Sequence, residues 1–208
     1  VLVESPTFLG ALQSFMAYGP RLVGVPVDDE GLCVDEFERL VQETKPKFAY
    51  LLPTFHNPAG VTMSLERRRR VVEIADHYGV PIVEDDPYGQ LRYEGEPLPS
   101  LAALDAERFP ENAVAGAYVK GNVIYLGSFS KTLAPGLRVS WAVCPGDLAQ
   151  QFVMAKQGAD LHTSALGNAF LARGLDDGRL APLLRGHGAD DAFLAAHFAL
   201  DLVHVHGA

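Results

Sequence analysis

Short apolar runs that alternate with segments of helical period constrain the fold of this 208-residue chain more than any other feature. A run of about four to eight apolar residues has the length of a buried strand, whereas apolar residues at helical spacing indicate one face of a helix. Strands that alternate with helices form βαβ units, in which helices cover both faces of a mostly parallel sheet. We therefore expect a three-layer α/β/α domain, with ligands bound beyond the carboxyl ends of its strands.

The same pattern places the individual elements along the chain. Strands are expected at residues 1–4, 22–27, 47–53, 81–85, 123–127 and 138–144. Helices are expected at residues 8–18, 34–44, 64–78, 147–157 and 165–175. Ser5-Pro6-Thr7 is expected to cap the first helix, and Ser64 and Gly79 mark the start and end of the third. The connection 91–122 is expected to hold one short helix and a surface loop.

Composition and charge narrow the function classes. The chain is 48% hydrophobic and 21% charged, which is typical of a globular protein and excludes wholesale disorder. Its 26 acidic and 17 basic residues give a formal charge of −9, so nucleic acid and anionic membrane surfaces are not expected partners. No apolar run is long enough to span a membrane. The two isolated cysteines, Cys33 and Cys144, are expected to be buried thiols in a reducing cytoplasm.

Four consecutive arginines, Arg67–Arg70, invite a nucleic-acid reading that the negative charge does not favour. At 100° per residue these side chains cannot share one face of a helix. The run is therefore expected to be a solvated helix surface with local ion pairs.

The segment that follows strand 123–127 carries the most chemistry. Lys131 lies just past the strand end, with Ser128 and Ser130 before it and Arg138 seven residues beyond. Hydroxyl groups donate hydrogen bonds to phosphate oxygens, and the arginine fork binds phosphate in a bidentate manner. A lysine amine beside such groups can hold an aldehyde cofactor, and its desolvation would lower its pKa. The alternative is a polar surface loop with a solvated lysine.

Two further strand ends carry polar groups. Asn57, in the segment HNPAG after strand 47–53, can donate a hydrogen bond to a phenolate oxygen, although Asn-Pro is also an ordinary turn signal. The carboxylates 84–86 follow strand 81–85 and precede Tyr88. Successive strand side chains point to opposite faces, which disfavours a metal site and favours the use of one of these carboxylates against a protonated pyridine nitrogen.

Taken in order, these segments resemble the class I/II aminotransferases, the pyridoxal-phosphate enzymes of fold type I. The resemblance covers about residues 1–175 and rests on the motifs ESPTF, HNPAG, VEDDPYGQL and GSFSKTLAPGLRV. The stretch AKQGADLHT looks especially like the branch that contains α-aminoadipate and broad-specificity aminotransferases. Aminotransferase-like domains of some regulators with an upstream helix-turn-helix lie in the same group.

This resemblance implies pyridoxal 5′-phosphate as the cofactor and assigns roles by motif position. Lys131 matches the Schiff-base lysine, which also moves a proton between the substrate α-carbon and the cofactor. Asp85 matches the partner of the pyridine nitrogen, with Asp86 as the alternative. Asn57 and Tyr88 match the ligands of the ring hydroxyl, and Tyr88 also counts as a catalytic residue. Phe8 matches the aromatic residue that stacks on the ring. The matches to the phosphate ligands are Ser128, Ser130 and Arg138.

The implied reaction is transfer of an amino group between a 2-aminoadipate-, leucine- or aromatic-like amino acid and a 2-oxo acid, by a cytoplasmic homodimer. The alternative is a pyridoxal-phosphate-binding sensor domain of an aminotransferase-like transcription regulator. Residues 1–185 are expected to form a partial large domain, truncated at both ends. Residues 186–208 are expected to be an atypical tail from a truncation or a frameshift. No metal, membrane or nucleic-acid partner is expected.

Overall fold

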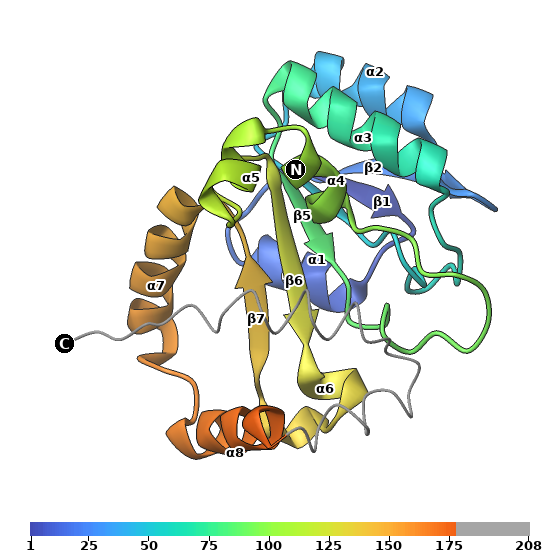
Figure 1. Cartoon of the computed structure of the whole chain (residues 1–208). Helices are drawn as coiled ribbons and strands as arrows, with labels where there is room; N and C mark the ends of the chain where they lie inside the picture. The colour runs from blue at the N-terminus through green and yellow to red at the C-terminus, as the bar shows by residue number, and fades with distance from the viewer. Residues whose placement is uncertain (178–208) are drawn as a thin grey trace. The chain divides into compact units, whose positions relative to one another are not determined.

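The computed structural model describes residues 1–177, which divide into two compact units (Figure 1). The expected tail at residues 186–208, and the expected domain boundary before it, lie outside the described residues. Within the described part, no helix is long and apolar enough to cross a membrane. Unit 1 comprises Val1–Asp86, Leu98–Gly127 and Trp141–Val153, and unit 2 comprises Pro87–Pro97, Ser128–Ser140 and the described residues from Met154 onward.

One sheet contains seven strands in the order β3-β2-β1-β4-β5-β6-β7. Its strands are β1 (Leu2–Ser5), β2 (Val23–Asp28), β3 (Gly31–Leu32), β4 (Ala49–Leu51), β5 (Ile82–Asp85), β6 (Val123–Ser128) and β7 (Ser140–Val143). The five strands β2, β1, β4, β5 and β6 pair in parallel, whereas β3 is antiparallel to β2. Figure 1 shows β7 running opposite to β6. The carboxyl ends of the parallel strands therefore lie at one edge, and the expected mostly parallel sheet is confirmed.

Five helices agree with the sequence pattern, whereas the region between β5 and β6 differs from it and the two short helices between β6 and β7 were not predicted. They are α1 (Leu9–Met16), α2 (Val34–Thr44), α3 (Leu65–Tyr78), α4 (Leu101–Glu107), α5 (Pro110–Ala115), α6 (Phe129–Thr132), α7 (Gly146–Asp160) and α8 (Ala165–Asp176), with a 3₁₀ turn η1 at Pro135–Leu137. The connection 91–122 holds two short helices, α4 and α5, instead of the single one expected. The two-residue strand β3 was also not predicted, since it is too short to show a period.

Two helix starts illustrate where cap signals succeed and fail. The Ser64 hydroxyl accepts a hydrogen bond from the Arg67 amide, and α3 ends at Gly79 with a φ of +64°, as the sequence predicts. The predicted cap of α1 at residues 5–7 is wrong. Its N-cap is Phe8, whose side chain accepts no capping hydrogen bond.

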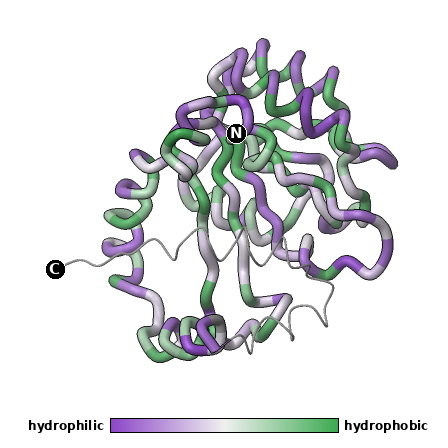
Figure 2. Tube along the Cα trace, viewed as in Figure 1, coloured by the Kyte–Doolittle hydropathy of each residue, from purple (hydrophilic) through white to green (hydrophobic). Residues whose placement is uncertain are grey.

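Side chains along the strands of unit 1 point alternately to the two faces of the sheet, and each face carries an apolar layer. Leu2, Leu51 and Ile82 belong to the larger core, which α2, α3 and α4 cover. Val3 and Tyr50 point to the other face, where α1 packs. Figure 2 shows the hydrophobic strands beneath helices α2 and α3, whose surfaces carry hydrophilic residues. This two-sided covering is the α/β/α layering expected from the sequence.

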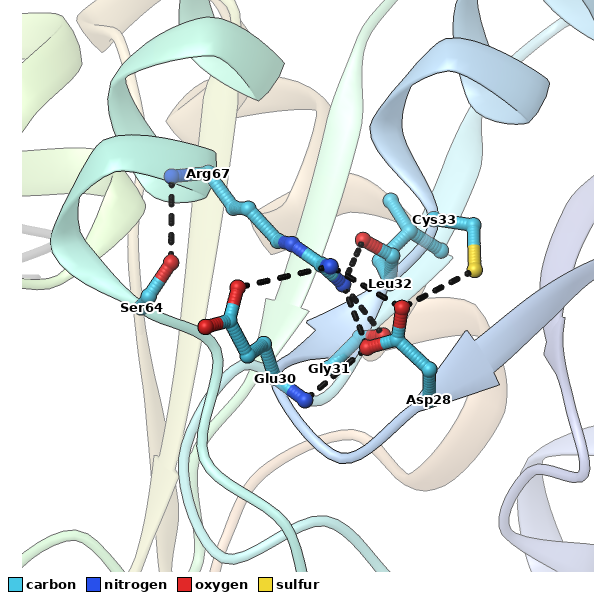
Figure 3. Close-up of polar contacts among 7 residues, drawn as sticks. All are labelled: Asp28, Glu30, Gly31, Leu32, Cys33, Ser64 and Arg67. Atoms are coloured by element: carbon cyan, nitrogen blue, oxygen red, sulfur yellow. Dashed lines mark hydrogen bonds and ion pairs between the residues drawn. The ribbon is translucent and has the colours of Figure 1, made fainter.

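The turn between β2 and β3 is fastened to α3 by Arg67 (Figure 3). The guanidinium donates to the Asp28 carboxylate at 2.6 Å and to the carbonyls of Gly31 and Leu32 at 3.0 Å. Its hydrogen bond to Asp28 lowers the pKa of that carboxyl to about 2. Cys33 donates its thiol to the same carboxylate at 3.6 Å. Both cysteines are free and only half-buried, so the expectation of buried thiols is wrong.

The sequence suggested that the whole arginine run lies on the surface, but one of the four arginines is buried. Arg67 and Arg70 make ion pairs with Asp28 and Asp35, which the helical period predicts for an exposed face. Arg68 is instead completely buried, and it donates to backbone carbonyls of Pro53, Met63 and Pro99 and to the Thr54 hydroxyl. Its charge is compensated by oxygen dipoles that line the end of β4 and the start of α3 and α4.

Candidate functional site

Three consecutive carboxylates end strand β5, and each is held by a different partner. Glu84 is completely buried and accepts hydrogen bonds of 2.9 Å from the backbone amides of Leu101 and Ala102, so it caps the N-terminus of α4. Burial raises the pKa of Glu84 to about 7, although these two amide bonds oppose the shift. Glu84 therefore has a structural role, in which it holds the N-terminus of α4 against the sheet.

Asp85 points to the opposite face, where the buried Tyr50 phenol donates a hydrogen bond to its Oδ2. Burial raises the pKa of Asp85, while the Tyr50 hydrogen bond lowers it. Asp86 accepts a hydrogen bond of 3.2 Å from the Tyr125 hydroxyl. Burial and the carboxylate of Asp86 both raise the pKa of Tyr125, so this phenol keeps its proton. The two candidate partners of a pyridine nitrogen are thus each oriented by a different tyrosine.

Strand alternation turns Asp85 away from Glu84 and Asp86, and each of the three carboxylates is held by a different partner. Across residues 1–177, no group of three or more His, Cys, Asp or Glu side chains could hold a metal ion.

Asn57 lies in a closed loop that follows β4. The loop is closed at its base by a hydrogen bond of 2.8 Å from the Met63 amide to the Pro53 carbonyl, and above it by one of 2.8 Å from the His56 amide to the Val61 carbonyl. Phe55 has a φ of +49°, a conformation that residues with a side chain adopt at a cost when neighbouring contacts demand it. The half-buried Asn57 side chain takes part in none of the hydrogen bonds found within residues 1–177, so its amide is available to a ligand.

Phe8 follows the carboxyl end of β1 and is 40% exposed. Its ring lies against Gly10, where an added Cβ would come within 2.6 Å of the ring. Glycine at position 10 therefore leaves room for this aromatic ring at the start of α1. The partly exposed ring is suited to stacking on a ligand.

In unit 2, Lys131 lies in α6, the short helix that follows β6. Its Nζ lies 5.8 Å from the centre of the Tyr88 ring, a cation–π distance. Within the described residues this amine has no carboxylate partner, and the Tyr88 hydroxyl takes part in no hydrogen bond. The expected desolvation of Lys131 is not found in the described part of the chain, where its side chain is exposed.

The hydroxyl of Ser128 organises the start of α6. Its Oγ accepts hydrogen bonds from the Ser130 amide at 3.0 Å and from the Ser140 hydroxyl at 3.2 Å. Both contacts use the oxygen as an acceptor, so its proton remains free to be donated to a ligand. Among the described contacts, the Ser130 hydroxyl has no partner.

Arg138 ends the turn η1 with a φ of +55°, in the left-handed region. Its guanidinium makes a single weak contact, 3.4 Å to the carbonyl of Pro135, and the side chain is exposed. This fork therefore keeps most of its donors for an anion. A non-glycine residue held in this conformation is typical of functional segments.

Sequence reasoning did not identify the two residues that orient these carboxylates, Tyr50 and Tyr125. It also did not identify a buried contact of 3.3 Å between His56 Nε2 and Glu4 Oε2. Strand alternation contains part of the signal, because Tyr50 pairs with Val83 and so shares a face with Asp85 two residues on. The contact of Glu4 with His56 joins residues far apart in sequence and leaves no periodic trace.

Residues 1–184 match the family described as aminotransferase class I and II. Aromatic-amino-acid aminotransferase 1 of Thermococcus litoralis is 43% identical over 86% of this chain and 41% of its own length. The 2-aminoadipate transaminase of Thermus thermophilus is 41% identical, over 86% of this chain and 42% of its own. An uncharacterized HTH-type transcriptional regulator of Bacillus subtilis is 35% identical, over 86% of this chain and 34% of its own length.

The fold is similar to a solved structure as well. The crystal structure of Pyrococcus horikoshii kynurenine aminotransferase, in complex with PMP, matches with a TM-score of 0.80 and 41% identity. That match covers 89% of this chain and 44% of the other. The chain thus spans about two fifths of the length of the enzymes it matches.

Proposed function

Because the chain belongs to the class I and II aminotransferases, we propose that it is part of a pyridoxal-phosphate-dependent enzyme that transfers an amino group between an amino acid and a 2-oxo acid. The observation that carries the proposal is the placement of Lys131. This primary amine follows the carboxyl end of a parallel strand, lies over the Tyr88 ring and has no carboxylate partner among the described residues. Such an amine is suited to bind an aldehyde.

The polar groups of the chain fit this cofactor. A pyridoxal phosphate presents an aldehyde, a ring oxygen, a ring nitrogen and a phosphate. The corresponding groups here are an amine, two unused donors at Asn57 and Tyr88, an oriented carboxylate at Asp85, and the donors of the segment 128–138. Each of these donors keeps hydrogen-bonding capacity that the described chain does not use.

In unit 1, we assign Asn57 to the ring oxygen, Asp85 to the ring nitrogen and Phe8 to a ring face. A carboxylate beside a pyridine nitrogen stabilises its protonated form. Tyr50 supports this role, because its hydrogen bond favours the ionised form of Asp85 against the effect of burial. Asp86 is the second candidate for the nitrogen.

In unit 2, we assign Ser128, Ser130 and Arg138 to the phosphate and Tyr88 to the ring oxygen. Ser128 has a free hydroxyl proton, and Arg138 supplies a permanent charge with a planar fork. When bound, the cofactor supplies an electron sink for the substrate α-carbon. The Nζ of Lys131 then serves as the base that takes the α-carbon proton and returns it.

The substrates proposed are 2-aminoadipate-, leucine- or aromatic-like amino acids. The names of the Thermococcus and Thermus relatives support the aromatic and aminoadipate classes. We also propose a homodimer in a reducing cytoplasm, for which the two free cysteines are suitable.

A second candidate function is a pyridoxal-phosphate-binding sensor domain, and the Bacillus regulator relative favours it. A sensor would bind the cofactor but turn over slowly. Sustained transfer of amino groups from aromatic amino acids or 2-aminoadipate to 2-oxoglutarate would show that the protein is an aminotransferase and not a sensor domain.

The test is to add pyridoxal phosphate to the full chain, reduce with borohydride and map the labelled peptide. The proposal expects label on Lys131 and none in the Lys131→Ala variant. Lys156→Ala is a matched control, since that amine is already paired with Asp160 at 2.8 Å and should leave the label unchanged. Label spread over surface lysines, or label retained in Lys131→Ala, would overturn the assignment.

A further inference from the structure

We propose that the buried pair Glu4–His56 is a positioning element that holds the loop of Asn57 against the sheet, and so fixes the Asn57 amide for the cofactor ring oxygen. The inference rests on the proposed function for its last step only. Neither residue belongs to the motif roles assigned above.

The two side chains are each 1% exposed, and His56 Nε2 lies 3.3 Å from Glu4 Oε2. The same Oε2 accepts a hydrogen bond of 2.6 Å from the Leu52 amide at the end of β4. Glu4 is in β1, an interior strand of the sheet, so its carboxylate joins β1 to the chain that leaves β4. A buried carboxylate is retained only where such partners compensate its charge.

The proton of His56 can be assigned from its contacts. The Nδ1 atom accepts a hydrogen bond of 3.2 Å from the Ala59 amide, so it carries no proton. In this state the single ring proton of His56 is on Nε2, the atom that faces the Glu4 carboxylate. The ring therefore accepts from the loop with one nitrogen and faces the sheet with the other.

His56 also organises the loop through its backbone. Its amide donates to the Val61 carbonyl at 2.8 Å, and its carbonyl accepts from the Gly60 amide at 2.6 Å. Three contacts thus tie residues 59–61 to one residue, and that residue is tied to Glu4. Asn57 is its direct neighbour in the chain. Displacing His56 would move Asn57 without removing any group that touches the cofactor.

Two variants separate the two nitrogens of the ring. The amide nitrogen of His56→Gln occupies the place of Nε2 and keeps the donor toward Glu4. The amide oxygen of His56→Asn occupies the place of Nδ1, keeping the acceptor for Ala59 but not the contact with Glu4. We expect His56→Asn to weaken pyridoxal-phosphate binding about tenfold, because the buried Glu4 carboxylate loses its polar neighbour at 3.3 Å, and His56→Gln to stay within about threefold.

A double-mutant cycle distinguishes positioning from general destabilisation. If His56 acts through Asn57, His56→Asn has no further effect on cofactor affinity in an Asn57→Ala background. Equal weakening in both backgrounds would overturn the proposal. Affinity is measured by equilibrium titration of the full chain, and thermal unfolding shows that each variant is folded.

A readout without cofactor keeps this inference separate from the proposed function. Hydrogen exchange of the Gly60 amide, which donates to the His56 backbone carbonyl in both variants, should be faster in His56→Asn than in His56→Gln, because the loop has lost its link to β1. Unchanged exchange in His56→Asn would contradict the positioning role. Failure of the wild-type chain to bind pyridoxal phosphate, with this exchange difference present, would instead count against the proposed function alone.

Discussion

The Tyr50 phenol, on strand β4, donates a hydrogen bond to Oδ2 of Asp85 at the end of the neighbouring strand β5. Parallel pairing sets this relationship, because Tyr50 is in register with Val83 and Asp85 lies two residues further on the same face. The hydrogen bond favours the ionised carboxylate, whereas burial favours the neutral one. Tyr50 therefore tunes the group proposed to face the ring nitrogen.

Removing this hydroxyl should reduce activity through Asp85. In Tyr50→Phe the pKa of Asp85 rises further, so its carboxylate is a poorer partner for a protonated ring nitrogen. We expect turnover to fall about tenfold, the scale of one hydrogen bond to a charged group. Steady-state kinetics and an NMR titration of the Asp85 carboxyl would measure both effects.

Tyr125→Phe provides the matched control, since it removes the corresponding hydrogen bond to Asp86. Turnover close to that of the unaltered protein is expected. If Tyr125→Phe were the more damaging change, the ring nitrogen would belong to Asp86.

Arg138 should matter only for ligands that carry a phosphate. Arg138→Met removes a charged fork, and we expect affinity for pyridoxal phosphate to fall about 10- to 100-fold. Affinity for pyridoxal, which lacks the phosphate, should change little. Titration with both compounds measures the difference, and an equal loss for both would argue against a phosphate contact.

Glu84 should make folding stability depend on pH. Its folded pKa of about 7 lies above the ordinary value of 4.5, so the folded chain binds more protons between these values. The free energy of unfolding should therefore fall as the pH rises from about 4.5 to about 7, by at most about 1.4 kcal/mol per pH unit, and level off above. Urea denaturation across this range should show a flatter profile for Glu84→Gln, which cannot ionise. Identical slopes for the two proteins would refute the assignment.

Two adjacent arginines of α3 should differ sharply in stability effects. Arg68→Met removes the guanidinium donor from the carbonyls of Met63 and Pro99 and from the Thr54 hydroxyl, and leaves the Pro53 carbonyl with the Met63 amide alone, at an expected cost of about 3 kcal/mol or more. Arg69 is exposed, so Arg69→Met should change the free energy of unfolding by no more than about 0.5 kcal/mol. Urea denaturation of both variants tests this, and similar costs would show that Arg68 is dispensable to the core.

Local signals carried most of the fold prediction. Runs of apolar residues located the strands that pair in parallel, and Ser64 and Gly79 located the ends of α3, because these features depend on near neighbours in sequence. The first cap was misplaced because Ser5 and Thr7 are good capping residues that the chain does not use for that purpose.

Nonlocal contacts could not be predicted in the same way. The helical period places Arg68 on the same face as the buried Val71, Val72 and Ala75, but it cannot show that carbonyls from β4 and α4 are there to accept its hydrogen bonds. Leu101, a partner of Glu84, is 17 positions away in sequence, and Tyr50, the partner of Asp85, is 35 positions away. Motif order suggested the roles of the site residues, and those roles remain predictions.

The position of β1 in the sheet has a consequence for how the chain folds. This strand is the first in sequence but lies between β2 and β4, and Leu2 pairs with both Val23 and Ala49. It cannot complete its hydrogen bonding until some fifty residues have followed it, and each of these pairings must first close a long loop. Parallel pairing of this kind is intrinsically slow. The nascent chain therefore carries an unpaired apolar strand during synthesis, a period when chaperones are most needed.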